Sequence, residues 1–293
     1  EFSQARAKLT DFIDRVFTPG PSPALEDVFT LLDYSISRRE YCAGESWSSL
    51  EAIRQALNIA ILFVINHATA HVPARQSEFY RRIAAYLVNE RLDAGQPADP
   101  FSVVLVNWDA ILESSVYWCL NEMHGFGKAD IDYCCYTTPL DATSLHRPSI
   151  LQKALGLFNV KLMKLHGSSN WLQCPNCNRM YTGLGSPAES GHLYVTRQYC
   201  PTCVPQRVTL DTAGGIPLSP FLISPTFLKV FDNPHIQMIW HNAYVDLAES
   251  NRVAFVGYSL PEADYHFRAL LRRAIRTDTD VEAVRIEDDM PPP

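Results

Sequence analysis

Two cysteine pairs constrain the fold of this chain more than any other feature. Cys174 and Cys177 form one CxxC pair, Cys200 and Cys203 form a second, and 22 residues separate them. Two thiolates at this spacing can bind one metal ion, and a second pair completes the tetrahedral ligand set of a zinc ribbon. Four cysteines leave no position for water or substrate, so the predicted zinc is structural. The alternative interpretation is two disulfides or four unrelated thiols.

The composition limits the classes of protein to which the chain can belong. Its 293 residues are 47% hydrophobic, which is enough for one large core or two modest ones. The net charge of −7 comes from well-mixed acidic and basic residues and argues against nucleic acid as a partner. The longest apolar run, residues 59–65, is too short to span a bilayer, so we expect a buried core helix and no membrane. Eight cysteines without a secretory signal fit a reducing compartment, which predicts a cytoplasmic protein.

Helical periodicity dominates the first third of the chain. Apolar residues recur at helical spacing over residues 3–17, 26–38, 47–70 and 76–93. Ser46 or Ser48 can cap the third of these helices. We therefore expect a helical N-terminal part over residues 1–99.

Apolar runs then alternate with helical patterns. Strands are predicted over residues 101–106, 131–136, 160–165, 221–223, 252–256 and 281–286. Helices are predicted over residues 110–123, 235–249 and 262–276. The alternation predicts an α/β fold with a doubly wound, Rossmann-like parallel sheet over residues 100–171 and 207–293, into which the zinc ribbon is inserted at 172–206.

Polar residues follow three of the predicted strands. Asn107 and Asp109 follow the first, His166 follows the strand over 160–165, and Gly257 and Ser259 follow the strand over 252–256. Open α/β sheets bind ligands at the carboxyl ends of their strands, so these residues form the candidate site. Each also has a simpler interpretation: His166 can cap a turn, Asp109 can cap a helix, and Gly257 to Ser259 can be a tight turn.

The order of these motifs resembles the sirtuin family, most closely its bacterial NAD-consuming, defence-type members. The segment Asn107-Trp108-Asp109 resembles the family's N-I-D, although Leu105 and Val106 replace the Thr and Gln that precede it. His166-Gly167 resembles the catalytic His-Gly that precedes the family's zinc ribbon. The resemblance covers about residues 100–287.

Two further motifs of the family follow the ribbon. Residues 214–220 (GGIPLSP) resemble its G-G-x-L-x-P, and Gly257-Tyr258-Ser259 resembles the Gly-Thr-Ser that contacts NAD. The resemblance implies that Gly215, Gly257 and Ser259 bind NAD together with Asn107 and Asp109.

The resemblance implies an enzyme that cleaves the nicotinamide–ribose bond of NAD. His166 is then the catalytic base, and Asn107 and Asp109 face the reacting ribose. With water as the acceptor the enzyme is an NAD glycohydrolase that releases nicotinamide and ADP-ribose, which is the leading expectation. With acyl-lysine as the acceptor it is a protein deacylase. Two non-catalytic alternatives are a sensor of NAD or ADP-ribose and a zinc-braced interaction module, and the sequence leaves a homo-oligomer open.

One motif of the family does not occur in this sequence. Sirtuins open with a strand and a glycine-rich turn, G-A-G-x-S, which cradles the NAD pyrophosphate at a helix N-terminus. No such motif precedes Asn107, and the chain begins with Glu1-Phe2. Either the segment that carries this turn is missing from the N-terminus, or the protein has lost the turn. We expect the first, and in both cases a chain that binds NAD weakly or not at all as it stands.

Overall fold

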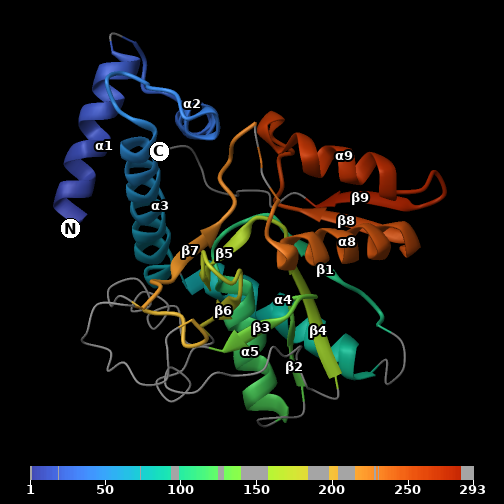
Figure 1. Ribbon diagram of the computed structural model, residues 1–293. Coiled ribbons are helices and arrows are strands. Elements are labelled where there is room, and N and C mark those ends of the chain that lie inside the picture. Colours follow the sequence, from blue (N-terminus) through green and yellow to red (C-terminus); the bar gives the residue numbers. More distant parts are fainter. Residues whose placement is uncertain are drawn as a thin grey trace.

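Four helices form the first third of the chain, as the periodicity predicts (Figure 1). They are α1 (Phe2–Phe17), α2 (Leu25–Arg38), α3 (Trp47–Ala70) and α4 (Ala74–Asp93). Ser46 caps α3, because its hydroxyl accepts a hydrogen bond from the amide of Ser49 at 3.3 Å. The computed structural model describes residues 2–18, 20–72, 74–93, 99–124, 129–139, 158–183, 198–203, 215–227, 229 and 231–284.

Helices α1, α2 and α3 share a hydrophobic core of their own. Its centre is formed by Phe12, Phe29, Leu32, Leu50 and Ile53, all of which are buried. This core is separate from the one around the parallel strands. The first three helices therefore form a distinct layer, whereas α4, the last helix of the predicted N-terminal part, packs in the core around the parallel strands.

The prediction that residues 59–65 form a buried core helix is wrong for one side of α3. Leu62 is 1% exposed, but Ile59, Phe63 and Val64 are 41%, 60% and 64% exposed. By length and composition alone α3 could cross a membrane, with 28% of its most apolar window buried. The core helix of a globular protein meets the same criterion, so one such helix is weak evidence for a membrane span.

A three-stranded parallel sheet lies at the centre of the main core. Its order is β1 (Val103–Leu105), β4 (Phe158–Lys164) and β2 (Ala129–Asp132). Leu162 and Met163 point to opposite faces of β4, and both are fully buried. Helices therefore cover both faces. Helix α4 contacts β4, α5 (Ile111–His124) contacts β2, and α8 (Pro234–Glu249) contacts β4.

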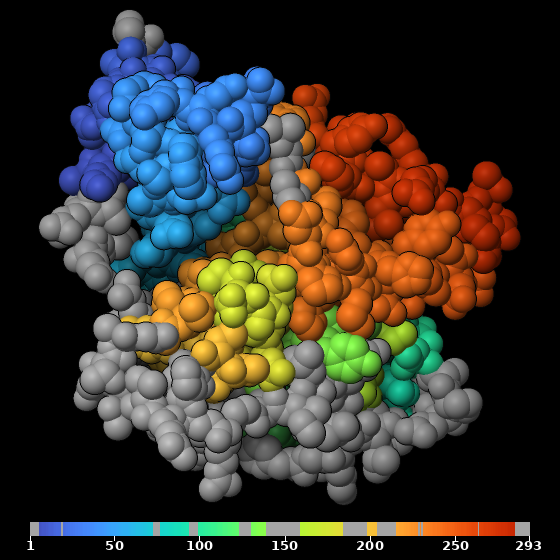
Figure 2. Space-filling view, in the orientation of Figure 1, coloured from blue at the N-terminus to red at the C-terminus, as the bar shows by residue number. Residues whose placement is uncertain are grey.

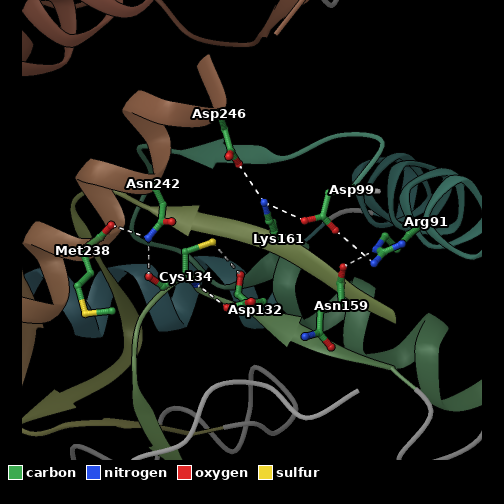
Figure 3. Close-up of polar contacts among 9 residues, drawn as sticks. All are labelled: Arg91, Asp99, Asp132, Cys134, Asn159, Lys161, Met238, Asn242 and Asp246. Atoms are coloured by element: carbon green, nitrogen blue, oxygen red, sulfur yellow. Dashed lines mark hydrogen bonds and ion pairs between the residues drawn. The ribbon is translucent and has the colours of Figure 1, made fainter. Parts of the chain in front are cut away.

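Ion pairs join the central strand of this sheet to two helices (Figure 3). Lys161 of β4 lies 2.9 Å from Asp99 and 3.5 Å from Asp246 of α8. Arg91 of α4 lies 3.2 Å from Asp99 and donates a hydrogen bond to the carbonyl of Asn159 at 2.9 Å. The contacts hold α4 and α8 against β4.

The other described strands form two further sheets. One contains β3 (Thr137–Pro139), β6 (Met180–Thr182), β5 (Gly167–Gln173) and β7 (Ser219–Leu222), in that order. The other pairs β8 (Arg252–Val256) with β9 (Asp280–Val284) in parallel. The short helix η2 (Glu262–Asp264) and α9 (Tyr265–Ala274) lie between β8 and β9 along the chain.

The sheet that contains β5 departs from the sequence-based expectation. The strand predicted over 221–223 is present as β7, but its assignment to the parallel sheet is wrong, because β7 pairs antiparallel with β5. Strand β5 itself is not predicted, and the predicted domain boundary at 171/172 falls inside it. The structure is mixed α/β with parallel segments, and a single doubly wound sheet stays a prediction.

Several predicted strands differ from the observed ones at their ends. The strand predicted over 131–136 is replaced by β2 and β3, with a turn between them in which Cys134 has a φ of 57°. The last predicted residues of the final strand, 285 and 286, lie outside the described residues. The strands over 101–106, 160–165 and 252–256 are present as β1, β4 and β8.

The N-terminal helices touch the chain between β7 and α8. The hydroxyls of Thr30 in α2 and Thr226 lie 3.2 Å apart, and Arg54 of α3 donates to the hydroxyl of Ser224 at 2.9 Å. In Figure 1 this part of the chain rises between α2 and α9 before it returns to α8. Figure 2 shows the blue N-terminal helices and the red C-terminal elements on either side of it.

Candidate functional site

The four predicted zinc ligands lie together. The sulfur atoms of Cys174, Cys177, Cys200 and Cys203 are all within 4.8 Å of one another. The closest pairs, Cys174 with Cys203 and Cys177 with Cys200, are 3.7 Å apart. A tetrahedral zinc ion places its sulfur ligands about 3.8 Å apart, whereas a disulfide needs about 2 Å. The cysteines are free thiols, and the cluster could hold a structural metal ion such as zinc.

The surroundings of the cysteines fit thiolate ligands. The amide of Cys174 donates to Arg179, and the amide of Asn178 donates to Cys174, which closes a tight turn around the first pair. Two further groups touch the sulfur atoms. The Tyr181 hydroxyl lies 3.1 Å from Sγ of Cys200, and the side-chain amide of Asn176 donates to Sγ of Cys203 at 3.4 Å. Donors to the sulfur atoms orient and stabilise thiolates that bind a metal.

The second group of predicted residues lies at the ends of β1 and β4. Since the two strands are parallel neighbours, the chain leaves both at the same edge of the sheet, where the Leu165 amide donates to the Leu105 carbonyl at 2.9 Å. His166 follows immediately. Its Nδ1 lies 3.0 Å from the carbonyl oxygen of Val106, the residue before Asn107. The structure thus brings His166 beside the first predicted strand end.

Asn107 and Asp109 contact each other at this edge. The side-chain amide of Asn107 donates to the Asp109 carboxylate, which also accepts a hydrogen bond from the Ile111 amide at 3.1 Å. Ile111 is the first residue of α5. Asp109 therefore caps this helix, which is the simpler of the two roles predicted for it. Asn107 is exposed to solvent.

A buried ion pair that the sequence analysis misses holds this loop in place. Lys164 lies 2.8 Å from Glu113 of α5, and its ammonium also donates to the carbonyl of Asp109. Both charged side chains are almost fully buried. Burial raises the pKa of Glu113, and the charge of Lys164 opposes that change. The pair connects β4 to the start of α5.

His166 is itself buried. Its residue is 5% exposed, and its ring lies 6.3 Å from that of Trp240, whose indole nitrogen donates to the carbonyl of Leu165. Burial and the positive charge of Lys229 lower the pKa of His166 to about 4. The imidazole is therefore neutral at physiological pH.

Two charged residues that the sequence analysis misses surround the other ring nitrogen. The Lys229 ammonium lies 3.3 Å from Nε2 of His166 and forms an ion pair with Asp264 of η2. The Tyr258 hydroxyl donates to the second oxygen of the same carboxylate. The sequence does contain a signal for Lys229, since it is the single charge in the apolar run over residues 227–231.

Through Tyr258 the predicted residues after β8 are joined to the same group. Gly257 and Ser259 flank Tyr258, and both are exposed. Gly257 has a φ of 64°, and a Cβ atom there would meet no atom within 4 Å. An exposed glycine at a strand end leaves its backbone open to a ligand.

Gly215 lies beside the cysteine cluster. The next residue, Ile216, accepts a hydrogen bond from the Cys200 amide at 2.9 Å and packs against the cluster. Gly214, the first glycine of the predicted motif, lies outside the described residues. The structure thus joins His166 to Val106, the neighbour of Asn107, and through Lys229 and Asp264 to Tyr258. It places Gly215 at the cysteine cluster.

One strand joins the two groups. His166 immediately precedes β5, Gly167 is its first residue, and Cys174 follows its last residue. A strand of this length extends about 20 to 25 Å, so the imidazole and the cysteines are separate sites. Comparison with models of protein families finds no match for the chain, and comparison with curated proteins finds no significant relative.

Proposed function

We propose that this chain is the NAD-cleaving part of a sirtuin-like NAD glycohydrolase, with Rossmann-like parallel strands and a structural zinc ion on its four cysteines. One observation carries the proposal. His166 is hydrogen-bonded to the end of β1 and is linked through Asp264 to Tyr258 after β8. Three separate motifs that resemble the family thus meet around one imidazole.

The chemistry of the bond explains why such a group is useful. Cleavage of the nicotinamide–ribose bond builds positive charge on the sugar, and a base near the sugar hydroxyls assists the step. A neutral imidazole has one nitrogen lone pair that can accept a proton. Asn107, exposed at the end of β1, can hold a ribose hydroxyl or orient the attacking water. The zinc ion braces β5 and takes no part in the reaction.

The release of nicotinamide and ADP-ribose tests the proposed reaction. The 293-residue chain is incubated with NAD, both alone and extended by any residues that its gene encodes ahead of Glu1, and both products are measured by chromatography. Release of the two products in equal amounts is expected. Release only after an acetyl-lysine peptide is added, with transfer of the acyl group, contradicts the proposal in favour of the deacylase.

A pair of histidine variants tests the role of His166. His166→Ala removes the base, so NAD turnover should fall about 100-fold or more. His241→Ala is the control, because His241 is exposed on α8 and should leave turnover unchanged. Full turnover in folded His166→Ala would show that the imidazole is not the base.

The burial of His166 favours a sensor of NAD or ADP-ribose as the second candidate function. Its Nε2 faces Lys229, and the ring is buried. Calorimetric titration separates the candidates. A sensor binds NAD or ADP-ribose without releasing nicotinamide, and His166→Ala then alters affinity but has no turnover to abolish.

A further inference from the structure

Two charged side chains that the proposed mechanism does not use lie against His166. Lys229 Nζ is 3.3 Å from Nε2 of His166, and Asp264 Oδ1 is 3.5 Å from the same nitrogen. Lys229 and Asp264 also form an ion pair with each other. All three side chains are buried or nearly so, and water therefore screens their charges poorly.

The hydrogen-bond partners of the ring determine where its proton lies. Nδ1 of His166 faces the carbonyl oxygen of Val106, which can only accept, so Nδ1 carries the proton. Nε2 faces the ammonium of Lys229, which can only donate, so Nε2 carries the lone pair. An imidazole whose two nitrogens are matched in this way is neutral.

The neighbouring charges act on the ring in opposite directions. Lys229 and, more weakly, His266 disfavour a positive imidazole, as burial does, whereas Asp264 favours it. The hydroxyl of Tyr258 and the ammonium of Lys229 occupy separate oxygens of the Asp264 carboxylate. The carboxylate is thus held between two donors. The charge of Lys229 opposes the effect of the carboxylate on the protonation of the ring.

We propose that Lys229 and Asp264 are positioning residues for His166: the Lys229 ammonium keeps the ring neutral with its proton on Nδ1, and Asp264 holds that ammonium in place. Their proposed role, to keep His166 available as an uncharged base at the strand ends, rests on the proposed function. When a substrate hydroxyl replaces Lys229 at Nε2, its O–H bond breaks, the proton forms an N–H bond at Nε2, and the electron pair stays on the hydroxyl oxygen. Asp264 then lies beside the imidazolium and stabilises it.

The protonation of His166 can be measured directly by NMR. Long-range 1H–15N correlations of the labelled chain report which ring nitrogen carries the proton, and His166→Gln identifies the signals. The wild-type ring is expected to have its proton on Nδ1 and to stay neutral down to about pH 4. A wild-type ring with its proton on Nε2 would overturn the assignment, and this measurement needs no substitution at Lys229 or Asp264.

Substitutions of the pair test its effect on the ring. In Lys229→Met the carboxylate acts on His166 unopposed, so the midpoint of its titration should rise by at least about one pH unit. The double variant Lys229→Met, Asp264→Asn should lose most of that rise. Lys229→Arg keeps the charge and should keep the wild-type midpoint. An unchanged midpoint in folded Lys229→Met overturns the proposal.

A matched lysine controls for the general loss of an ion pair. Lys161 of β4 is paired with Asp99 and Asp246 (Figure 3), and Lys161→Met should leave the titration of His166 unchanged. A comparable rise in this control would show that Lys229→Met acts through general loosening and would contradict the proposal. Since no NAD is present, absence of turnover would refute the glycohydrolase and leave the protonation result intact.

Discussion

His166 connects the chemistry of a single side chain to the stability of the protein. Burial and Lys229 lower the pKa of His166 from 6.5 to about 4 in the folded protein. The unfolded chain therefore binds one more proton than the folded chain between these two values. Folding stability that is present above about pH 6.5 is lost as the pH falls toward 4.

Chemical denaturation of wild type and His166→Gln at pH 7 and pH 4.5 measures this contribution. The wild-type protein should lose about 2 kcal/mol more than the variant over this range, because glutamine does not titrate. The lowered pKa values of His235 and His266 act in the same direction, but both residues are present in both proteins. Equal losses in the two proteins would contradict the low pKa of His166.

At this scale the sequence predicts residues that are set by local pattern. The CxxC spacing predicts the cysteine cluster, and the serines at positions 46 and 48 predict a cap for α3, which Ser46 provides. The sequence does not predict the partners of His166. Lys229 and Asp264 lie 63 and 98 positions farther along the chain, and only the fold brings them to the ring.

Among the elements, β5 depends most on a single residue. Its first residue, Gly167, has a φ of 78°, and a Cβ atom there would lie 2.2 Å from the carbonyl oxygen of Phe221 in β7. The backbone of β7 cannot move away without breaking its pairing with β5. A side chain at position 167 is therefore excluded both by conformation and by space.

The two positive-φ glycines of the candidate site form a matched pair for mutation. Gly167→Ala should destabilise the protein by about 2 kcal/mol or more, from strain and steric overlap together. Gly257→Ala should cost only about 1 kcal/mol, because its φ of 64° is unfavourable for alanine but the space is open. Urea denaturation of the two variants gives both values. Equal costs would contradict the close approach of β7 to Gly167.

Element prediction succeeds where apolar periodicity is clear and fails for β5. Its residues Ser168, Ser169 and Asn170 are polar, and the sequence suggests a turn after His166. All three are nevertheless buried, because they bond to other parts of the chain: the Ser169 amide donates to Trp108, and Asn170 accepts from Gly183. Polar strands whose hydrogen-bond partners lie far away in the sequence have no local signature.

At the scale of the whole molecule, the cysteine cluster ties the segment over residues 198–203 to the end of β5. A small apolar group of Leu172, Tyr181, Ile216 and Leu218 surrounds it. The contacts bring residues from β5, β6 and the chain before β7 together at one point. A bound metal ion should therefore contribute much of the stability of this region.

Metal analysis and thermal unfolding test this contribution. The purified chain should contain about one zinc ion, and removal by a strong chelator should lower Tm by at least about 5 °C. Cys200→Ser should lose the metal. Cys42→Ser should keep it, since Cys42 lies outside the cluster. Metal-free wild-type protein with unchanged Tm would contradict a structural zinc site.

The irregular pairing of β5 with β7 has a consequence for comparisons of related chains. Gly167 pairs with Leu222, and Leu172 pairs with Pro220, so β5 holds more residues between these two pairings than β7 does. The surplus residues, Ser168 to Trp171, are all buried, so packing on both sides fixes the length of this interval. An insertion or deletion there would shift the His-Gly step relative to the cysteine pairs. Related chains should therefore keep the number of residues between Gly167 and Cys174 constant.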